Sequence, residues 1–311
     1  MCRLLLKSKN YPRGLSAALI VNASPLGLLI PPSASQILYA WAAQQSVLKA
    51  FLSTIIPGLI LIVLLCLVSY FCLRNVHDLK LEQKVSPFNF ALKKRSIKAL
   101  PAMTMPLIIL GGIYGGIMTP VEAAGLAVIY AIPIGIYVYK GLTWTTLLQS
   151  FRRSAVTIGV VMVMIFMVLI VSRFLIFEDI PGMARDLIYS VSDNPIIVLL
   201  MVNLVLILIG MLMDDISGLL LAVPLLLPIV REAGMDPIHF AAVLGVNLGM
   251  ANITPPTAPL LYLGAQITET PVNEMLKPTL LMIIFAWLPT LLLTTFIPQL
   301  SLWLPNLLLG N

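Results

Sequence analysis

Two long apolar segments of the chain, residues 15–43 and 238–267, share the same kind of interruption. The first contains Ile-Pro-Pro-Ser at 30–33, and the second contains Thr-Pro-Pro-Thr at 254–257. Two adjacent prolines remove two amide donors and clash with the preceding turn, so a helix cannot continue through them. Inside a bilayer the freed carbonyl groups need a partner. Matched breaks in two halves of a chain indicate the binding site of a secondary transporter.

The other apolar stretches predict further membrane-spanning helices. About 20 apolar residues are needed to cross about 30 Å of hydrocarbon. Hydropathy along a window of that length therefore identifies the stretches that can span the membrane. Full spans are predicted over residues 50–73, 99–118, 119–139, 155–177 and 278–298, and an interfacial amphipathic piece over 140–153. The stretch 195–231 is interrupted by acidic and small residues at 214–218, which predicts a re-entrant hairpin with these residues at its tip. The sequence therefore predicts an all-α, polytopic membrane protein.

The composition agrees with this class and sets the orientation. Hydrophobic residues make up 59% of the chain, charged residues only 10%, and the mean hydropathy is +1.01. If the N-terminus and the basic loop 74–98 are cytoplasmic, 15 of the 19 Lys and Arg residues lie inside, as the positive-inside rule requires. The two interrupted segments then run in opposite directions, which is typical of inverted repeats. The net charge of +6 follows from this loop bias and implies no nucleic-acid partner.

The breaks and the hairpin tip carry oxygen atoms that suit an alkali cation. Hard cations prefer oxygen ligands, and small residues allow the backbone to approach closely. The candidate cation ligands are Ser24, Ser33, Asp214, Ser217, Gly249, Asn252, Thr254 and Thr257. A structural kink satisfied by neighbouring hydroxyls is the alternative for the breaks. For the acidic tip the alternative is a hydrated loop near the interface.

Three further residues are candidates for binding a substrate: Arg173, Asp215 and Asn247. An arginine within a span can pair with the carboxylate of an anionic substrate. Arg173 also lies close to Glu178 and Asp179, so an ion-paired residue that snorkels to the interface is the alternative.

Enzymatic sites are not predicted. An intramembrane aspartyl protease needs carboxylates from two separate helices, whereas Asp214 and Asp215 lie on one turn. The glycine-rich stretch 110–116 follows no strand and precedes no lysine, so close helix packing explains it better than a nucleotide loop. His77 and His239 lack the clustered partners of a metal site. We expect no enzyme and no organic cofactor.

Several short motifs together resemble a known transporter family. In chain order they occupy residues 22–27 with 30–33, 110–116, 119–124, 210–214, 235–240, and 247–249 with 253–256. They resemble the large membrane (permease, M-type) subunit of tripartite ATP-independent periplasmic (TRAP) transporters, and the resemblance covers essentially the whole chain. It implies a sodium-coupled, elevator-type importer in the bacterial inner membrane, taking a small organic acid such as a C4-dicarboxylate, a sugar acid or a sialic-acid-like compound. It also implies a periplasmic binding protein that delivers the substrate and a small four-helix membrane subunit as partners.

The chain departs from the family by starting late. The family's subunit carries further spans before the region where this sequence begins, so we expect an N-terminally truncated form. Residues 1–98 would be the C-terminal part of a first repeat, with broken helix 15–43, span 50–73 and cytoplasmic loop 74–98. Residues 99–311 would form a complete second repeat. A transport-inactive remnant, an assembly partner of a split transporter that needs a further polypeptide for the missing spans, and a passive channel are the alternatives.

The orientation can be tested at Ser86, in the basic loop. A cysteine introduced there should be shielded from impermeant thiol reagents in intact cells, because the seven basic residues of residues 74–98 hold this loop in the cytoplasm. Ready labelling would overturn the orientation and the argument for inverted repeats.

Overall fold

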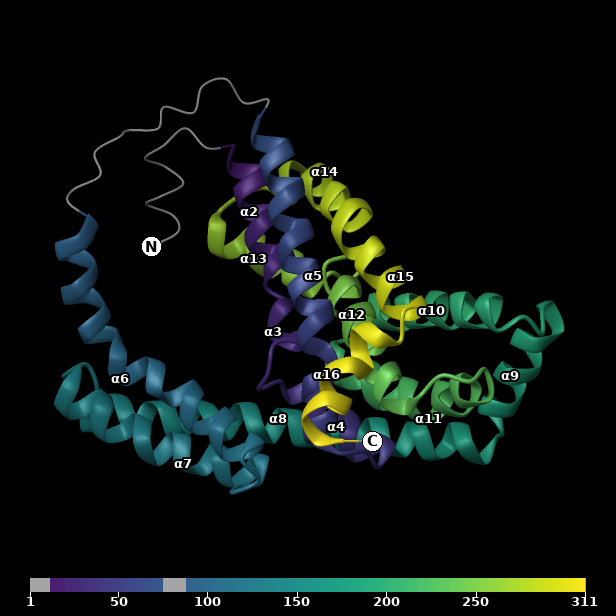
Figure 1. Ribbon diagram of the computed structural model, residues 1–311, viewed down its shortest axis with the longest axis horizontal. Helices are drawn as coiled ribbons and strands as arrows, with labels where there is room; N and C mark the ends of the chain where they lie inside the picture. Colours follow the sequence, from purple (N-terminus) through teal and green to yellow (C-terminus); the bar gives the residue numbers. More distant parts are fainter. Residues whose placement is uncertain (1–11, 75–87, 311) are drawn as a thin grey trace. The chain divides into compact units, whose positions relative to one another are not determined.

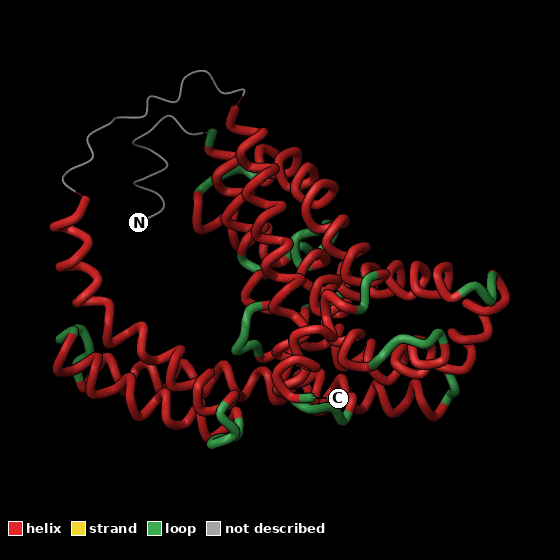
Figure 2. The backbone as a smooth tube through the Cα atoms, viewed as in Figure 1, coloured by secondary structure: helices red, strands yellow, loops and turns green. Residues whose placement is uncertain are grey.

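The computed structural model describes residues 12–74 and 88–310, and every regular element in these ranges is a helix (Figures 1 and 2). The loop position Ser86 and the N-terminal basic residues Arg3, Lys7 and Lys9 lie outside the described residues. Within the described ranges, five helices are long and apolar enough to cross a membrane, and a sixth is added if one bent pair counts as a span. The prediction of an all-helical, multi-pass membrane protein is confirmed.

The chain divides into two compact units, one formed by residues 1–80 with 165–311 and the other by residues 81–164. This division rests on packing and does not test the proposed repeats. The helices described in the first unit are α2 (Arg13–Ala23), α3 (Leu26–Leu29), α4 (Ala34–Ala43), α5 (Val47–Arg74), the end of α8 (Trp144–Phe177), α9 (Ile180–Val191), α10 (Pro195–Leu212), α11 (Asp215–Glu232), α12 (Pro237–Ala251), α13 (Pro259–Thr268), α14 (Val272–Met282), the π-helix η2 (Ile283–Trp287), α15 (Leu288–Phe296) and α16 (Gln299–Leu309).

The second unit contains α6 (Phe88–Tyr114), α7 (Pro120–Pro133), the π-helix η1 (Ile134–Val138) and the first part of α8. Helix α7 starts with a capping box. The Thr119 hydroxyl accepts from the amide of Glu122, and the Glu122 carboxylate accepts from the amide of Thr119 at 2.7 Å. Pro120 at the first position has no amide to satisfy, so the capping box and this proline account for most of the free amides at this start.

Helix α12 is the centre of the first unit. Apart from His239 and Asn247 its side chains are apolar on all sides, and every residue from 238 to 251 is buried. A helix without a polar face is stable only where protein surrounds it. Helices α3, α4, α5, α10, α11 and α15 all contact it. At 15 residues it is about 22 Å long, which is less than the hydrocarbon thickness of about 30 Å.

The two interrupted segments pack against each other in opposite directions. Helix α2 contacts α13, and α4 contacts α12, so each half of one segment lies on the opposite half of the other. The side chain of Gln36 donates to the carbonyl of Ala241 at 3.2 Å, and the hydroxyl of Tyr39 donates to the carbonyl of Pro237. At the other contact the helices nearly touch, because a Cβ placed on Gly264 would lie 2.1 Å from Cγ2 of Val21.

Several elements differ from the sequence prediction. Most of the predicted interfacial piece 140–153 and the span 155–177 form one continuous helix, α8, of 34 residues, because no proline separates them. The predicted span 278–298 begins earlier, as α14, and continues through η2 into α15. Helix α9 follows Phe177 where no helix was predicted, and residues 299–309, beyond the predicted last span, form α16.

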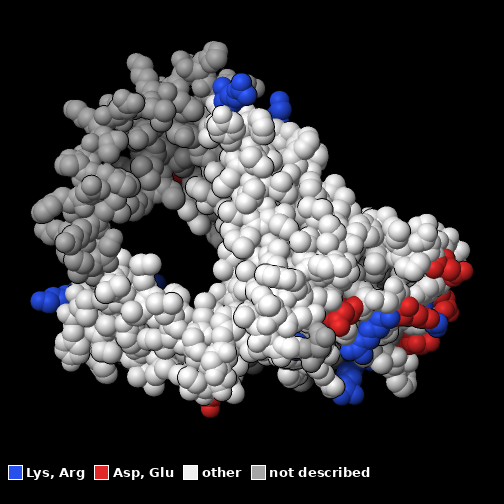
Figure 3. Space-filling model, in the orientation of Figure 1, with Lys and Arg blue, Asp and Glu red and all other residues white. Residues whose placement is uncertain are grey.

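A bidentate ion pair ties α9 to the end of α11. Two nitrogen atoms of one guanidinium group, Nε and Nη2 of Arg185, donate to the two carboxylate oxygens of Glu232 at 2.6 and 2.7 Å. The hydrogen bonds from Arg185 hold the pKa of the Glu232 carboxyl below its usual range. In the first unit, Figure 3 shows charged atoms near α9 and α11 and at the ends of α5 and α14, with an uncharged surface between them. This is the distribution expected of a membrane-embedded body.

The close contact between α13 and α2 predicts a stability difference between two glycines. Gly264→Ala should destabilise the protein by about 1–3 kcal/mol, because the new methyl group collides with the buried, β-branched Val21. Gly27→Ala is the matched control, since no atom lies within 4 Å of its added Cβ. Thermal unfolding in detergent measures both. Equal melting temperatures for the two variants would contradict the packing described here.

Candidate functional site

The hairpin of α10 and α11 turns at Asp214. Its carboxylate is the N-cap of α11 and accepts hydrogen bonds from the amides of Ile216 at 3.1 Å and Ser217 at 3.3 Å. Aspartate is among the residues preferred at this position, which explains why the helix begins here. Gly210, one turn before the tip, lets α10 approach α12 closely, because an added Cβ would lie 2.5 Å from that of Ala251.

The second break is closed by its own polar groups. Helix α12 ends at Ala251 and α13 begins at Pro259, and residues 252–258 are not helical (Figure 2). The hydroxyl of Thr254 donates to the carbonyl of Met250 at 2.7 Å. Across the break, the amide of Leu260 donates to the carbonyl of Asn252 at 3.2 Å. These hydrogen bonds satisfy some of the backbone carbonyl groups that lack helical partners at the break.

The break and the hairpin tip lie together. The hydroxyl of Thr257 donates to the carbonyl of Met211 at 2.6 Å, which joins the second break to the end of α10. The carbonyl ends of α10 and α12 and the amide ends of α11 and α13 therefore meet in one region. Helix carbonyl ends carry partial negative charge and favour cations, whereas amide ends favour anions. The arrangement can bind charges of both signs.

Two asparagines occupy matching places in the two broken segments. Asn22 in α2 donates to the carbonyl of Ala18 at 2.8 Å, and Asn247 in α12 donates to the carbonyl of Val243 at 3.1 Å. Both side chains are fully buried, and the Oδ1 atom of each has no hydrogen-bond partner among the described residues. A buried oxygen without a partner is costly and rare in a native protein. A bound cation or water would satisfy it.

The other candidate residues divide into those at this region and those elsewhere. Asp215 follows Asp214 in the first turn of α11 and is half-buried. Gly249 allows close packing, since an added Cβ would lie 2.9 Å from the Trp287 ring and 3.2 Å from Cβ of Pro25. Ser24 donates to the carbonyl of Ile20, and Ser33 shares a hydrogen bond with Ser35, both in the first segment.

Arg173 is not brought to the break. It is exposed on the last turns of α8, and the structure gives it no hydrogen bond or ion pair with another described residue. Its role in substrate binding stays a prediction. The hydroxyl protons of Thr254 and Thr257 are directed to backbone carbonyls, so these side chains close the turn whether or not their oxygens also bind an ion.

The whole chain resembles one family of transporter components. Residues 1–300 match the DctM component of tripartite ATP-independent periplasmic transporters. The chain belongs to this family. As a DctM-family protein whose described part contains five or six apolar spans, it is a multi-pass protein of the inner membrane.

Three curated relatives show how the chain compares with other DctM-type permeases. It is 34% identical over 298 residues to the C4-dicarboxylate TRAP transporter large permease protein of Pseudomonas aeruginosa, covering 95% of this chain and 68% of that protein. It is 31% identical over 301 residues to the sialic acid large permease protein of Vibrio cholerae, covering 97% and 69%. It is 31% identical over 303 residues to the isethionate permease protein of Oleidesulfovibrio alaskensis, covering 95% and 46%.

The chain thus spans about half the length of the isethionate relative and about two thirds of the other two. All three relatives are named as permeases, which agrees with the expectation that this DctM-family chain is not an enzyme.

The structure adds a buried polar network that the sequence reasoning missed. Nδ2 of Asn247 donates to Oδ1 of Asn203 at 2.7 Å, and Nδ2 of Asn203 donates to the hydroxyl of Thr295 at 3.1 Å. The network links α12 to α10 and α15. Asn203 is the only strongly polar residue in the apolar run 195–212, so its position within that run was a signal that could have identified it.

This network predicts coupling between α10 and α15 in the DctM-family fold. Asn203→Leu and Thr295→Val should each destabilise the protein, and their effects should be non-additive by about 0.6 to 1.7 kcal/mol, the range of interhelical hydrogen bonds in membranes. A double-mutant cycle of thermal unfolding in detergent measures the term. Additivity within about 0.3 kcal/mol would show that the contact does not contribute.

Proposed function

We propose that this chain is the membrane subunit of a sodium-coupled secondary transporter that imports a small organic acid. The observation that carries the proposal is the meeting of four helix ends at the second break and the hairpin tip, joined by the hydrogen bond from Thr257 to Met211. A rigid body that presents both carbonyl ends and amide ends inside a bilayer suits a cation and a carboxylate bound side by side.

Sodium is the cation that the donor set fits. The region offers hydroxyl, amide and backbone carbonyl oxygens together with the Asp214 carboxylate, all of them hard ligands. The partnerless Oδ1 atoms of Asn22 and Asn247 are further buried acceptors in the two broken segments. Among the described residues, no group of three or more His, Cys, Asp and Glu side chains could hold a transition metal. The residues that would hold sodium are Asp214, Ser217, Asn252, Thr254 and Thr257, with Ser24, Ser33 and Gly249 contributing at the first break and through close packing.

A carboxylate substrate suits the same region. The amide ends of α11 and α13 carry partial positive charge, although Asp214 already accepts from two amides of α11. A cation bound beside the tip would offset that carboxylate and leave the amide ends available to an anion. This gives a physical reason for coupling, because each ligand then improves the site for the other. Asp215, Asn247 and Arg173 remain the candidates for contacting the acid.

The relatives support the substrate class and the partners. Their names describe transport of a C4-dicarboxylate, sialic acid and isethionate, which are all small organic anions. We therefore expect delivery by a periplasmic binding protein and assembly with a small four-helix membrane subunit. In proteoliposomes that contain this assembly, uptake should depend on an inward sodium gradient. Equal uptake with and without the gradient would exclude coupling and favour a passive channel.

The role of Asp214 in sodium binding can be separated from its role as a helix cap. Asparagine caps helices as well as aspartate does, so Asp214→Asn keeps the cap and removes the charge. In the assembly we expect the sodium concentration for half-maximal uptake to rise roughly tenfold, equivalent to about 1.4 kcal/mol. Thr254→Val should act in the same direction, while Thr254→Ser, which keeps the hydroxyl, should not.

Asp236→Asn is the matched control. Asp236 caps the start of α12 in the same way, accepting from the amides of Ile238 at 2.7 Å and His239 at 3.4 Å, but it lies at the other end of that helix from the break. This variant should keep the wild-type sodium response. If Asp214→Asn and Thr254→Val also kept it, these side chains would not be ligands, and the polar break would be a structural hinge.

A further inference from the structure

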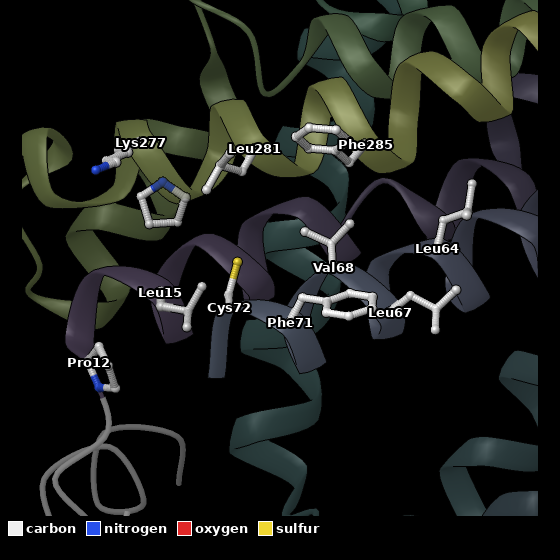
Figure 4. Close-up of a pocket in the computed structure, with 11 residues that line it drawn as sticks. Pro12, Leu15, Leu64, Leu67, Val68, Phe71, Cys72, Lys277, Leu281 and Phe285 are labelled. Carbon is white, nitrogen blue, oxygen red and sulfur yellow. The ribbon is translucent and has the colours of Figure 1, made fainter. Parts of the chain in front are cut away.

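One concave surface of the first unit is lined by none of the residues of the second break. A cavity of about 720 Å³ opens between the start of α2, the last turns of α5, and α14 with η2. Figure 4 shows Leu15, Val68, Cys72, Leu281 and Phe285 around it, with Lys277 at one end. Apart from Lys277 and the Cys72 thiol, the side chains that line the cavity are hydrocarbon.

The lining follows one face of each helix. On α5 it includes Leu64, Val68 and Cys72, which are one turn apart, and on α14 and η2 it includes Lys277, Leu281 and Phe285 at the same spacing. Eight residues of helix rise about 12 Å, so the cavity is an elongated groove along these helices. Helix α5 is long and apolar enough to cross the membrane, so the groove opens toward the acyl chains of the bilayer.

Basic residues surround the end of the groove where α5 leaves the membrane. Lys277 lines it, Arg74 lies two residues beyond Cys72, and Arg13 follows the lining residue Pro12; all three side chains are exposed. On α2, α5 and α14 the one acidic residue is Glu274, which precedes Lys277 by one turn. The sequence predicts that the loop after Arg74 is cytoplasmic, so this rim faces the cytoplasmic leaflet.

The lining of the groove favours an anionic lipid as its occupant. The side chains are hydrocarbon along about 12 Å of helix, which suits acyl chains, and the one charged lining residue, Lys277, lies at one end. Basic pockets between membrane helices on the cytoplasmic side are suited to anionic lipid head groups.

We propose that this groove binds one anionic phospholipid of the cytoplasmic leaflet. The acyl chains lie along α5 between Leu64 and Cys72, and the phosphate contacts Lys277, with Arg74 and Arg13 close by. Ordinary boundary lipid on an apolar helix surface would show no preference for a head group. The proposed site requires both the charge at its rim and the open groove.

Native mass spectrometry of the full chain in mild detergent tests the charge. The probes are phosphatidylglycerol and phosphatidylcholine with identical acyl chains. Phosphatidylglycerol should be retained in preference, and Lys277→Gln should weaken its retention about fivefold, since one basic residue near an anionic lipid contributes about 1 kcal/mol. Lys49→Gln, at the other end of α5, is the matched control and should leave retention unchanged. Equal retention of the two lipids, or equal effects of the two variants, would overturn the proposal.

The native cysteines test whether lipid occupies the groove while the basic residues at its end are left unchanged. In a Cys2→Ser chain reconstituted in nanodiscs, a membrane-permeant maleimide should modify Cys72 more slowly with phosphatidylglycerol than with phosphatidylcholine. Cys66 on the same helix is exposed and does not line the groove, so its rate should not depend on the head group. Val68→Trp should abolish the lipid effect at Cys72 by filling the groove, whereas Val63→Trp, on an exposed position outside it, should not.

A lipid site would be contradicted if the modification rates of Cys66 and Cys72 changed with the head group by the same factor. It would also be contradicted if the modification rate of Cys72 did not depend on the head group. A polypeptide cross-linked to Cys72 in the assembled transporter would show that a protein partner occupies the groove, and would also overturn the proposal.

Discussion

Every polar group of the backbone that lies in hydrocarbon must find a partner within the protein, and the architecture around α12 follows from this constraint. Two segments that prolines prevent from being continuous helices can exist at membrane depth only where other helices cover them. The covering is reciprocal, since α2 lies on α13 and α4 lies on α12. The polar side chains of α4 donate directly into carbonyls of α12, so the contact that shields one segment also supplies hydrogen bonds to the other.

The same constraint limits what the site residues can do. Thr254 and Thr257 close the break, and Asp214 caps α11, so each has a structural bond before any ligand is considered. Such residues hold their remaining lone pairs in fixed positions, which is the form of preorganisation that ion binding needs. Loss of one of these side chains therefore affects both shape and affinity. Substitutions that keep the cap or the hydroxyl are the ones that separate the two effects.

The sequence predicted the features that depend on neighbouring residues. A pair of prolines, a glycine before a turn and an aspartate at a helix start act within one turn of their own position, so both breaks and the turn at Asp214 could be recognised. The contact of Asn203 with Asn247, 44 residues apart, could not, because it depends on how α10 packs against α12. The continuity of α8 was also missed, since two arginines at 152 and 153 mark a polar patch without interrupting a helix.

The burial of α12 has a consequence for the biogenesis of the protein. Its neighbours α15 and α16 are synthesised after it, and both pack against it. Until they leave the insertion machinery, a helix too short for the bilayer lacks part of its cover. The final packing of α12 therefore follows the synthesis of α15 and α16, near the end of translation. A chain that stopped before α15 would leave one side of α12 uncovered.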